Sequence, residues 1–433
     1  MQTVLVIGSG GREYELARQM SLSAAVGSVI VAPGNAGTAL LSKTVNAPIG
    51  PIEIEAQIAL VKERSVDTVI IGPDASVAAG VGDALRAEGV AVFGPNLQPG
   101  KLESSKAFAA DFMKRHNVPQ PEFWTAGNLE EALEIIADKS PKSYVLKADG
   151  LAAGKGVVLP RSKQEAVQTL ELMFSSDAYD GAGMTGVVIQ ERLSGPEVSA
   201  FAVSDGKDIF MLPFAQDHKR LQDGDQGPNT GGMGSYCPVP GTIVDSEQTA
   251  KIHDIAKKTI AAIASDGTPY QGVLYIGLML AKQRGGDPVV IEYNARFGDP
   301  ETQVLLTSMQ QSGVDVADLL TSAANDDISH LQVPTSVKAS LTVAIAAIGY
   351  PNSPRKGDVI HGLGKKYKNV VVQHAGTAKK DSDIVTAGGR VLYVTGFGDT
   401  VAEAAQHAYA AIGKDGIHFA DMQYRTDIGY QAI

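Results

Sequence analysis

The residues best suited to chemistry lie in one stretch, VVIEYNARFGDPETQ, at positions 289–303. Its apolar and β-branched residues predict a β-strand, in which successive side chains point to opposite faces. One face would carry Glu292, Asn294 and Arg296, and the other would carry Ile291, Tyr293 and Ala295. A carboxylate, an amide oxygen and a guanidinium in line suit a site that holds Mg²⁺ and neutralises a phosphate chain. A solvated polar face of an antiparallel sheet is the competing interpretation, and this stretch alone leaves both open.

A glycine-rich segment with two lysines offers a second site. Lys147 lies on a predicted strand, and Lys155 lies in the loop Gly150-Leu151-Ala152-Ala153-Gly154-Lys155-Gly156 that follows. The loop is not a P-loop, because three residues rather than four separate its first two glycines and Gly156 takes the Ser/Thr position. The pattern favours a flap that closes over a nucleoside triphosphate, with amides and cations meeting the phosphates. A surface hairpin with solvated lysines is the alternative.

Two later segments add polar groups. The strand and connector 187–193 is followed by Glu197, a pattern that suits backbone hydrogen bonds to adenine and a carboxylate on ribose. A long glycine-rich stretch, 216–234, begins with Asp217 and His218. Long loops in compact domains are usually functional or disordered. The Asp217-His218 pair suggests a catalytic base, although such pairs are more often structural contacts, and no activated Ser or Cys accompanies it.

The N-terminal third carries glycine loops at the ends of predicted strands. Apolar strands alternate with helical patterns, which is typical of an open parallel sheet. The fingerprint of a dinucleotide site is missing, because Glu13 replaces its third glycine and no acid ends the second strand, which excludes a dehydrogenase. Phosphate binding survives, because Gly8, Gly10, Gly11 and Arg12 offer amides and a cation at a helix N-terminus. The loops 33–38 and 72–76 lie at strand ends on the same side, so we expect a sugar-phosphate site there.

The elements that position these groups follow in order. Residues 96–103 form a junction containing Pro and Gly, and a helix over 104–116 carries Lys106. Asn128 and Ser162 cap two further helices. From residue 337 the pattern changes to that of a smaller α+β domain, closed by a helix that Thr400 and Glu403 open as a capping box. His361 and His374 of this region could face a site, but lone histidines are more often structural.

Composition limits the classes of protein. The chain has 433 residues, enough for two to four domains. Its net charge of −11 argues against nucleic acid as the main partner, and its single cysteine, Cys237, rules out an internal disulfide. The start lacks the pattern of a signal peptide, and no apolar run reaches the length of a membrane span. We expect a cytoplasmic protein without membrane or nucleic-acid partners.

The ordered motifs resemble the ATP-grasp superfamily and, within it, the glycinamide ribonucleotide synthetase family of purine biosynthesis. The similarity runs along the whole chain, through VLVIGSGGRE, APGNAGT, LESSKAF, LKADGLAAGKGVV, QDHKR, GPNTGGMGSYCP, IEYNARFGDPETQ, GDVIHG, HAGT, GGRVL and DIGYQAI. The resemblance implies an α/β and α+β multidomain fold. It consists of an N-terminal open parallel α/β sheet (1–102), an ATP-grasp core (103–328) with an inserted flap domain (122–190), and a small C-terminal α+β closing domain (329–433).

The resemblance also implies an ATP-dependent ligase that joins glycine to 5-phosphoribosylamine through glycyl phosphate, with Mg²⁺ or Mn²⁺, as a monomer or weak dimer. The implied metal ligands are Glu292 and Asn294, and the implied catalytic residues are Arg296, Lys155 and Asp217. ATP contacts would come from Lys106, Lys147, Gly154, Lys155, Gly156, Glu191, Leu193 and Glu197. Substrate contacts would come from Gly10, Gly11, Arg12, Glu13, Asn35, Gly37, Thr38, Asp74, Asp217, Asn229 and Thr230.

The sequence departs from the family pattern at two places in the sugar-phosphate region. Tyr14 replaces the usual His of GGREH, and Gly72-Pro73-Asp74-Ala75-Ser76 replaces GPEAP. The metal and nucleotide motifs are intact, so we expect the chemistry to be retained. Two rival functions remain: a nucleotide-binding regulator without turnover, and an ATP-grasp ligase for another acid and amine.

Overall fold

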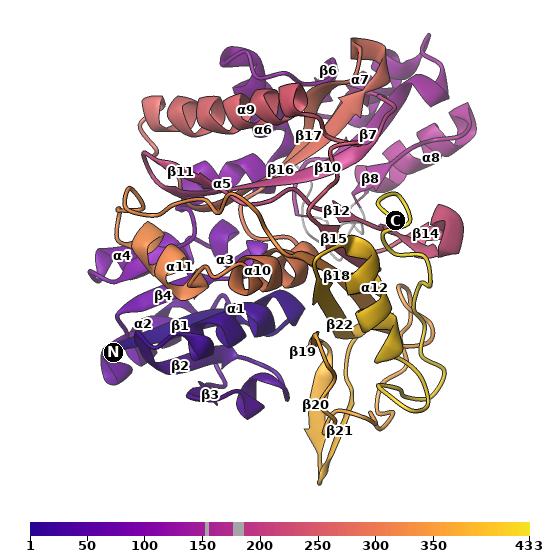
Figure 1. The fold of residues 1–433 in the computed structure, drawn as a ribbon. Coiled ribbons are helices and arrows are strands. Elements are labelled where there is room, and N and C mark those ends of the chain that lie inside the picture. Colours follow the sequence, from indigo (N-terminus) through magenta and orange to yellow (C-terminus); the bar gives the residue numbers. More distant parts are fainter. Residues whose placement is uncertain (152–155, 176–185) are drawn as a thin grey trace.

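The structure is a computed structural model that describes residues 1–151, 156–175 and 186–433 (Figure 1). Its N-terminal part is a parallel sheet with the strand order β3-β2-β1-β4-β5, as predicted. The strands are β1 (Gln2–Gly8), β2 (Val26–Pro33), β3 (Thr44–Asn46), β4 (Thr68–Ile71) and β5 (Ala91–Phe93). Short elements between them are α1 (Gly11–Leu22), η1 (Thr38–Leu40), α2 (Ile54–Arg64), α3 (Asp74–Ala78) and α4 (Val81–Ala87). The alternating residues of β1 enter two different cores, so both faces of this sheet are buried.

The segment 96–103, expected to form a junction, is largely the helix α5 (Leu97–Ser104). Pro99 lies in its first turn, where backbone N–H groups have no partner within the helix, so the proline breaks no hydrogen bond. Ser105 then caps α6 (Lys106–Arg115), its hydroxyl accepting from Phe108 N at 3.1 Å. The predicted helix carrying Lys106 therefore begins after this cap.

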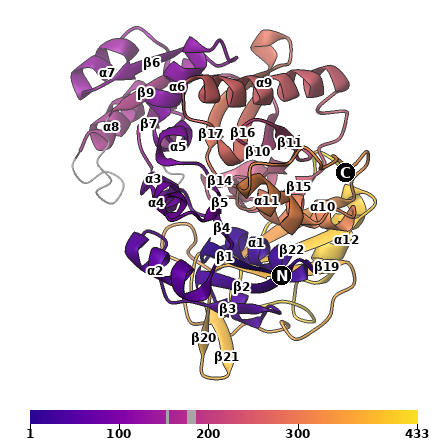
Figure 2. The same cartoon turned by 90° about the vertical axis from the view of Figure 1, so that its left-hand side faces the viewer.

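A small antiparallel sheet with the order β6-β9-β7-β8 extends from the body of the molecule (Figure 2). Its elements are β6 (Phe123–Ala126), α7 (Leu129–Ile136), η2 (Pro141–Ser143), β7 (Tyr144–Ala148), β8 (Val157–Val158), α8 (Lys163–Met173) and β9 (Val187–Glu191). Asn128 and Ser162 cap α7 and α8, as predicted. The two helices and the sheet form their own apolar core.

The central sheet, β11-β10-β16-β17, is antiparallel and packed on both faces. Its strands are β10 (Glu197–Asp205), β11 (Ile209–Met211), β16 (Gln271–Ala281) and β17 (Asp287–Asn294), with η5 (Lys282–Arg284) between the last two. The helix α9 (Ser246–Ser265) covers one face. The helices α10 (Glu301–Gln311) and α11 (Val316–Ala324) cover the other and share their core with β1 and α1 (Figure 1). The strand β17 therefore lies between a cleft, which it lines together with α6 and β7, and the core that α9 covers.

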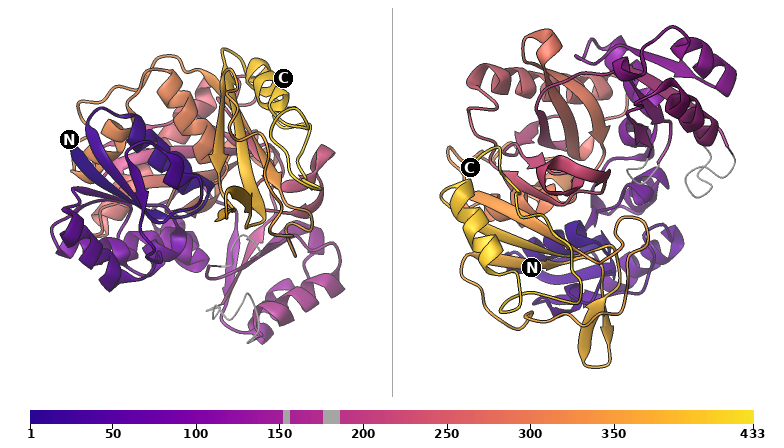
Figure 3. Two further views of the ribbon diagram at one scale, coloured as in Figure 1. Left: turned by 90° about the horizontal axis from the view of Figure 1, so that it is seen from below. Right: turned by 90° about the vertical axis from the view of Figure 1, so that its right-hand side faces the viewer.

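The C-terminal sheet has the order β12-β15-β18-β22-β19 and recruits strands from earlier in the chain (Figure 3). Its strands are β12 (Gln216–Asp217), β15 (Gly234–Cys237), β18 (Ala339–Ala346), β19 (Val370–His374) and β22 (Arg390–Gly398), and α12 (Val401–Ala410) packs on it. Two hairpins accompany it, one of β13 (Arg220–Gln222), η4 (Asp223–Asp225) and β14 (Gln226–Asn229), the other of β20 (Thr377–Lys380) and β21 (Asp383–Thr386). Thr400 caps α12 as predicted, its hydroxyl accepting from Glu403 N at 3.2 Å, but the capping box is incomplete, because the Glu403 carboxylate accepts from Asp399 N rather than from Thr400 N. In the part of the chain that the structure describes, no helix is long and apolar enough to cross a membrane.

Candidate active site

The polar face of β17 lines a cleft, with one correction to the predicted alternation. Gly277 of β16 pairs with Glu292, whereas the next residue, Leu278, pairs with Val290. Ile291 is therefore an extra, bulged residue, and it faces the cleft together with Glu292 instead of facing the core. Tyr293 and Ala295 are buried in cores, as predicted. The bulge gives the cleft an apolar wall directly beside its carboxylate.

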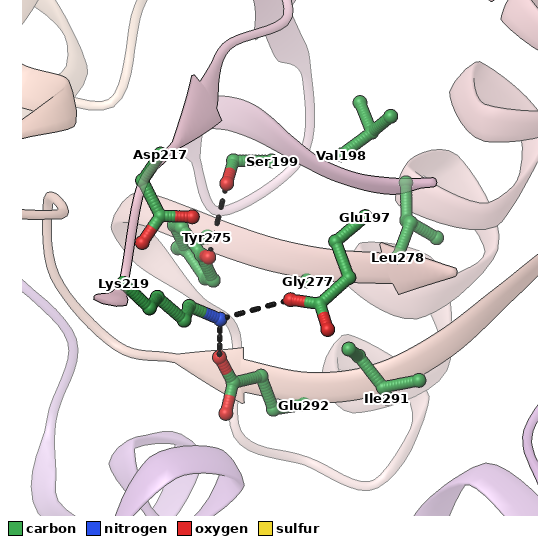
Figure 4. Close-up of a pocket in the computed structure, with 10 residues that line it drawn as sticks. All are labelled: Glu197, Val198, Ser199, Asp217, Lys219, Tyr275, Gly277, Leu278, Ile291 and Glu292. Carbon is green, nitrogen blue, oxygen red and sulfur yellow. Dashed lines mark hydrogen bonds and ion pairs between the residues drawn. The ribbon is translucent and has the colours of Figure 1, made fainter. Parts of the chain in front are cut away.

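A lysine that the sequence analysis left out lies at the centre of the first pocket (Figure 4). Lys219 Nζ lies 3.1 Å from Glu197 Oε2 and 3.9 Å from Glu292 Oε1, and Asp217 faces the same pocket. Glu197 and Asp217 raise the pKa of Lys219 well above its usual value, so it is a cation. The sequence offered a signal for it, because side chains two positions apart, such as those of Asp217 and Lys219, lie on the same side of an extended chain.

The carboxylates of this pocket differ in their electrostatics. Burial opposes ionisation of Glu292, but the cations Lys219, Lys147 and Lys106 outweigh burial and lower its pKa. Burial raises the pKa of Asp217 despite Lys219. Glu301, at the start of α10, is buried behind the pocket, 3.4 Å from Ser199 Oγ, and has a pKa of about 7, raised first by burial and then by Asp217. An ionised carboxylate, a cation and protonatable acids therefore lie side by side, a combination that marks functional sites.

The second pocket continues from Glu292 between β17 and α6. The lysines Lys106 and Lys147 and the amide of Asn294 line it, with apolar contacts from α6. Lys147 Nζ donates to Ile291 O at 2.6 Å, and burial lowers the pKa of Lys147 to about 8 in spite of Glu292. Two lysines facing one acid leave positive charge for a phosphate chain.

A second residue that the sequence analysis missed, Glu103 of α5, supports this end of β17. Its Oε2 accepts from Ala295 N at 2.7 Å, and its Oε1 lies 2.9 Å from Arg296 Nη2. When Asn294 is oriented so that Nδ2 donates to Glu103 Oε1 at 3.1 Å, Oδ1 is turned away from Glu103. Burial raises the pKa of Glu103, whereas Arg296 lowers it. Its place at the end of a helix gave no sequence signal for a site.

Of the other residues predicted to contact a nucleotide, the structure describes some and not others. Glu191 Oε2 lies 2.8 Å from Arg284 Nη2, and Leu193 packs in a small core beside Ile291. Gly156 is buried, and its carbonyl accepts from Ala148 N at 2.8 Å. Gly154 and Lys155, for which ATP contacts were predicted, lie outside the described residues.

The N-terminal loops meet over the carboxylate of Glu13. Gly10 N donates to its Oε2 at 2.7 Å, and Arg12 Nε lies 2.6 Å from its Oε1. A Cβ at Gly8 or Gly72 would collide with the same side chain, so glycine lets these loops approach it. A side chain on Gly11 would strike Tyr393 of the C-terminal sheet. Glu13 thus joins the first loop to the third, which carries Asp74 on the first turn of α3.

The second loop is fixed by its own side chains. Asn35 Oδ1 accepts from Gly37 N at 2.8 Å and from Thr38 N at 3.1 Å. Asn35 Nδ2 donates to Ser9 O at 2.9 Å and to His374 O at 3.3 Å. The loop therefore joins the first loop to the C-terminal sheet.

Arginine side chains join the N-terminal loops to the cleft. Arg12 Nη1 and Arg296 Nη1 both donate to Phe297 O at 3.1 Å. Asn229 is exposed in the β13–β14 hairpin, and Thr230 is held by Lys219 O, which accepts from its backbone N at 2.7 Å. The residues of the cleft and of the loops thus form one continuous region.

Tyr14, the departure from the family pattern, lies beside the loops but is buried. Its ring stacks on His374 with 5.6 Å between centroids, and burial raises its pKa to about 12. The aromatic face, rather than the hydroxyl, makes the contact between α1 and β19.

Comparisons with known proteins indicate one family for nearly the whole chain. Family models match at residues 2–103, 104–302 and 340–431, described as the N domain, the ATP-grasp (A) domain and the C domain of phosphoribosylglycinamide synthetase. A phosphoribosylamine–glycine ligase of Ralstonia nicotianae is 44% identical over 430 residues, which cover 99% of each chain.

Solved structures extend the comparison. A crystal structure of a phosphoribosylamine–glycine ligase from Thermotoga maritima is 36% identical with a TM-score of 0.86, covering 99% of this chain and 100% of that one. The biotin carboxylase domain of 2-oxoglutarate carboxylase from Hydrogenobacter thermophilus, in complex with MgADP, has a TM-score of 0.74 at 15% identity. It covers 98% of this chain and 91% of that one, and this likeness is one of fold alone.

Proposed function

The chain belongs to the phosphoribosylglycinamide synthetase family, and from this membership we propose that it is an ATP-dependent ligase that joins glycine to 5-phosphoribosylamine. The products would be glycinamide ribonucleotide, ADP and phosphate. The observation that supports this best is the meeting of Lys147, Lys219 and Glu292 at the bulge of β17. It brings cations for phosphates and an ionised acid for a metal ion to one place.

ATP would occupy the cleft between the small antiparallel sheet and the central sheet. Lys106 and Lys147 would meet its phosphates, Leu193 and Ile291 would pack on the base, and Glu191 and Glu197 lie at the rim for polar contacts. Lys155, Gly154 and Gly156 would belong to a flap over the phosphates. The proposed domains are the N-terminal domain (1–102), the ATP-grasp core (103–328) with its inserted flap domain (122–190), and the closing domain (329–433).

The donor set fits a divalent cation of the Mg²⁺ type. Glu292 is ionised, and the hydrogen bond from Asn294 Nδ2 to Glu103 turns the amide oxygen away from that acid. Oxygen ligands are those that Mg²⁺ and Mn²⁺ prefer. Such an ion would neutralise charge on the transferring phosphate and the ADP that leaves.

In the proposed reaction the carboxylate of glycine attacks the γ-phosphorus of ATP, which forms glycyl phosphate and releases ADP. The amine of 5-phosphoribosylamine then attacks the acyl carbon, which forms the amide and releases phosphate and a proton. Lys147 and Arg296 would orient and neutralise the anions, and Asp217 would contact the amino acid in the pocket. The anchored N-terminal loops, including Gly10, Arg12, Asn35, Thr38 and Asp74, would bind the sugar phosphate.

The experiment that tests this is ADP release by the purified protein with Mg²⁺-ATP and glycine, with and without 5-phosphoribosylamine generated in place. Release that requires both substrates supports the ligase. Binding of ATP without release would point to a regulator, and release with another acid and amine would point to a different ligase. We further propose that the enzyme acts in the cytoplasm as a monomer or weak dimer, which sedimentation would test.

A further inference from the structure

The segment 425–430 is bound against the β13–β14 hairpin and against His218, which lies between Asp217 and Lys219. Arg425, which is fully buried, reaches the β13–β14 hairpin, with Nη1 2.6 Å from Asp225 Oδ1 and Nε 2.7 Å from Asp427 Oδ1. Thr426 N donates to Asp223 Oδ1 at 2.8 Å. This hairpin begins directly after Lys219, so its position and that of the lysine are linked through the backbone.

His218 makes the contact closest to the pocket. Asp217 and Lys219 line the pocket, whereas the ring of His218 lies against Tyr430, with 5.7 Å between the ring centroids. The ring is buried, and Nε2 accepts from Gly429 N at 3.0 Å. Its backbone is fixed as well, since His218 N donates to Gly234 O at 2.8 Å and Met233 N donates to His218 O at 2.7 Å.

The geometry excludes His218 as the proton acceptor of the reaction. Its accepting nitrogen already has a donor in Gly429, which places the ring proton on Nδ1. Nδ1 lies 3.8 Å from Asp225 Oδ1, on the side of the segment 425–430 rather than of the pocket. Burial and the nearby Arg425 lower the pKa of His218 to about 4, so the ring is neutral at neutral pH.

We propose that His218 is a positioning residue that, together with Arg425, couples the segment 425–430 to the pocket side chains Asp217 and Lys219. The inference rests on the proposed function, because its readout is turnover. Loss of the acceptor would leave the buried Gly429 N–H without a partner, and the segment would then pull away from the strand. Lys219 would lose its fixed distance to Glu197 and Glu292.

The test compares His218→Leu with His218→Gln, whose amide oxygen can accept from Gly429 N. We expect kcat of His218→Leu to fall at least about tenfold, which corresponds to about 1.4 kcal/mol. The Michaelis constant of 5-phosphoribosylamine should stay near that of the wild type, because its loops are held by contacts of their own, such as Gly10 N with Glu13 and Asn35 Nδ2 with Ser9 O. His218→Gln should recover most of the loss. A kcat of His218→Leu within twofold of the wild type, or no recovery in His218→Gln, would overturn the inference.

A matched arginine pair controls for general loss of stability. Arg355 also binds two aspartates, with Nε 2.8 Å from Asp358 and Nη1 3.0 Å from Asp421, but it lies at the surface away from the hairpin. We expect Arg425→Gln to lower kcat and to speed amide exchange over 217–234, and Arg355→Gln to do neither. Equal effects of both variants would refute the coupling.

Tyr430→Phe and amide exchange in Arg425→Gln provide two further tests. If His218→Leu does not fold, Tyr430→Phe removes only the hydrogen bond from the half-exposed Tyr430 to Asp225 (2.8 Å), and kcat should fall about threefold. An unchanged kcat in that variant would count against the coupling. If the wild type shows no ADP release, the proposed ligase fails, whereas faster exchange over 217–234 in Arg425→Gln would still support the coupling.

Discussion

Replacement of Lys147 by methionine should stabilise the nucleotide-free protein while it weakens ATP binding. Lys147 is 8% exposed, and burial lowers its pKa from 10.5 to about 8. At about 1.36 kcal/mol per pKa unit, holding the charged lysine in the folded state at pH 7 costs about 3 kcal/mol. Loss of the hydrogen bond to Ile291 O destabilises the variant by about 1 kcal/mol. We therefore expect a net stabilisation of about 2 kcal/mol for Lys147→Met.

The stability gained in Lys147→Met should decrease as the pH rises. The pKa of Lys147 is lower in the folded than in the unfolded chain, so the free-energy cost of its charge is complete below about pH 8, shrinks as the pH rises, and is absent above pH 10.5. The advantage of Lys147→Met over the wild type should therefore be largest at pH 7 and shrink by pH 9.5. Urea unfolding of both proteins at these two pH values measures it.

A lysine with a similar hydrogen bond but no burial provides the control. Lys258 is exposed and donates to Asn117 O at 2.6 Å, the same distance as in the Lys147 bond. Lys258→Met should not stabilise the protein, and it should leave the Michaelis constant for ATP unchanged. Mg²⁺-ATP should raise the unfolding temperature of the wild type more than that of Lys147→Met. A destabilised Lys147→Met, or one that binds ATP as tightly as the wild type, would refute the reasoning.

Two further predictions concern the metal site and the altered loop motif. Glu292→Gln should cut turnover strongly, because an ionised ligand is lost, while the fold survives, because the amide has the same shape as the carboxylate. Glu247→Gln, which alters an exposed ion pair on α9, serves as the control. Near-normal turnover of Glu292→Gln at saturating Mg²⁺ would argue against its role as a ligand. Tyr14→His should change the Michaelis constant for 5-phosphoribosylamine by less than about tenfold, or about 1.4 kcal/mol, because Tyr14 packs on His374 through its ring face. Steady-state kinetics of both proteins measure this, and a wild type that is inactive until histidine is restored would show that the position matters more.

The local sequence determined the elements and the faces of most site residues. Alternating apolar strands and helical patterns predicted the parallel N-terminal sheet, and capping residues at Asn128, Ser162 and Thr400 marked helix starts correctly. These features depend on residues within a few positions of one another, so a sequence pattern is enough to reveal them. The glycine loops follow the same logic, because a turn needs particular residues at particular positions.

Tertiary structure decided what depends on pairing between distant segments. The bulge that turns Ile291 into the cleft arises where β17 pairs with β16. The pairing of β12 with β15, and of β15 with β18, makes the strand of Asp217 the edge of the C-terminal sheet. Glu103 reaches Ala295 across 192 positions, and Gly429 reaches His218 across 211. No local pattern encodes such contacts, because they are selected by the packing of whole sheets. The sequence thus named most of the acids and cations, and the fold determined which of them share a pocket.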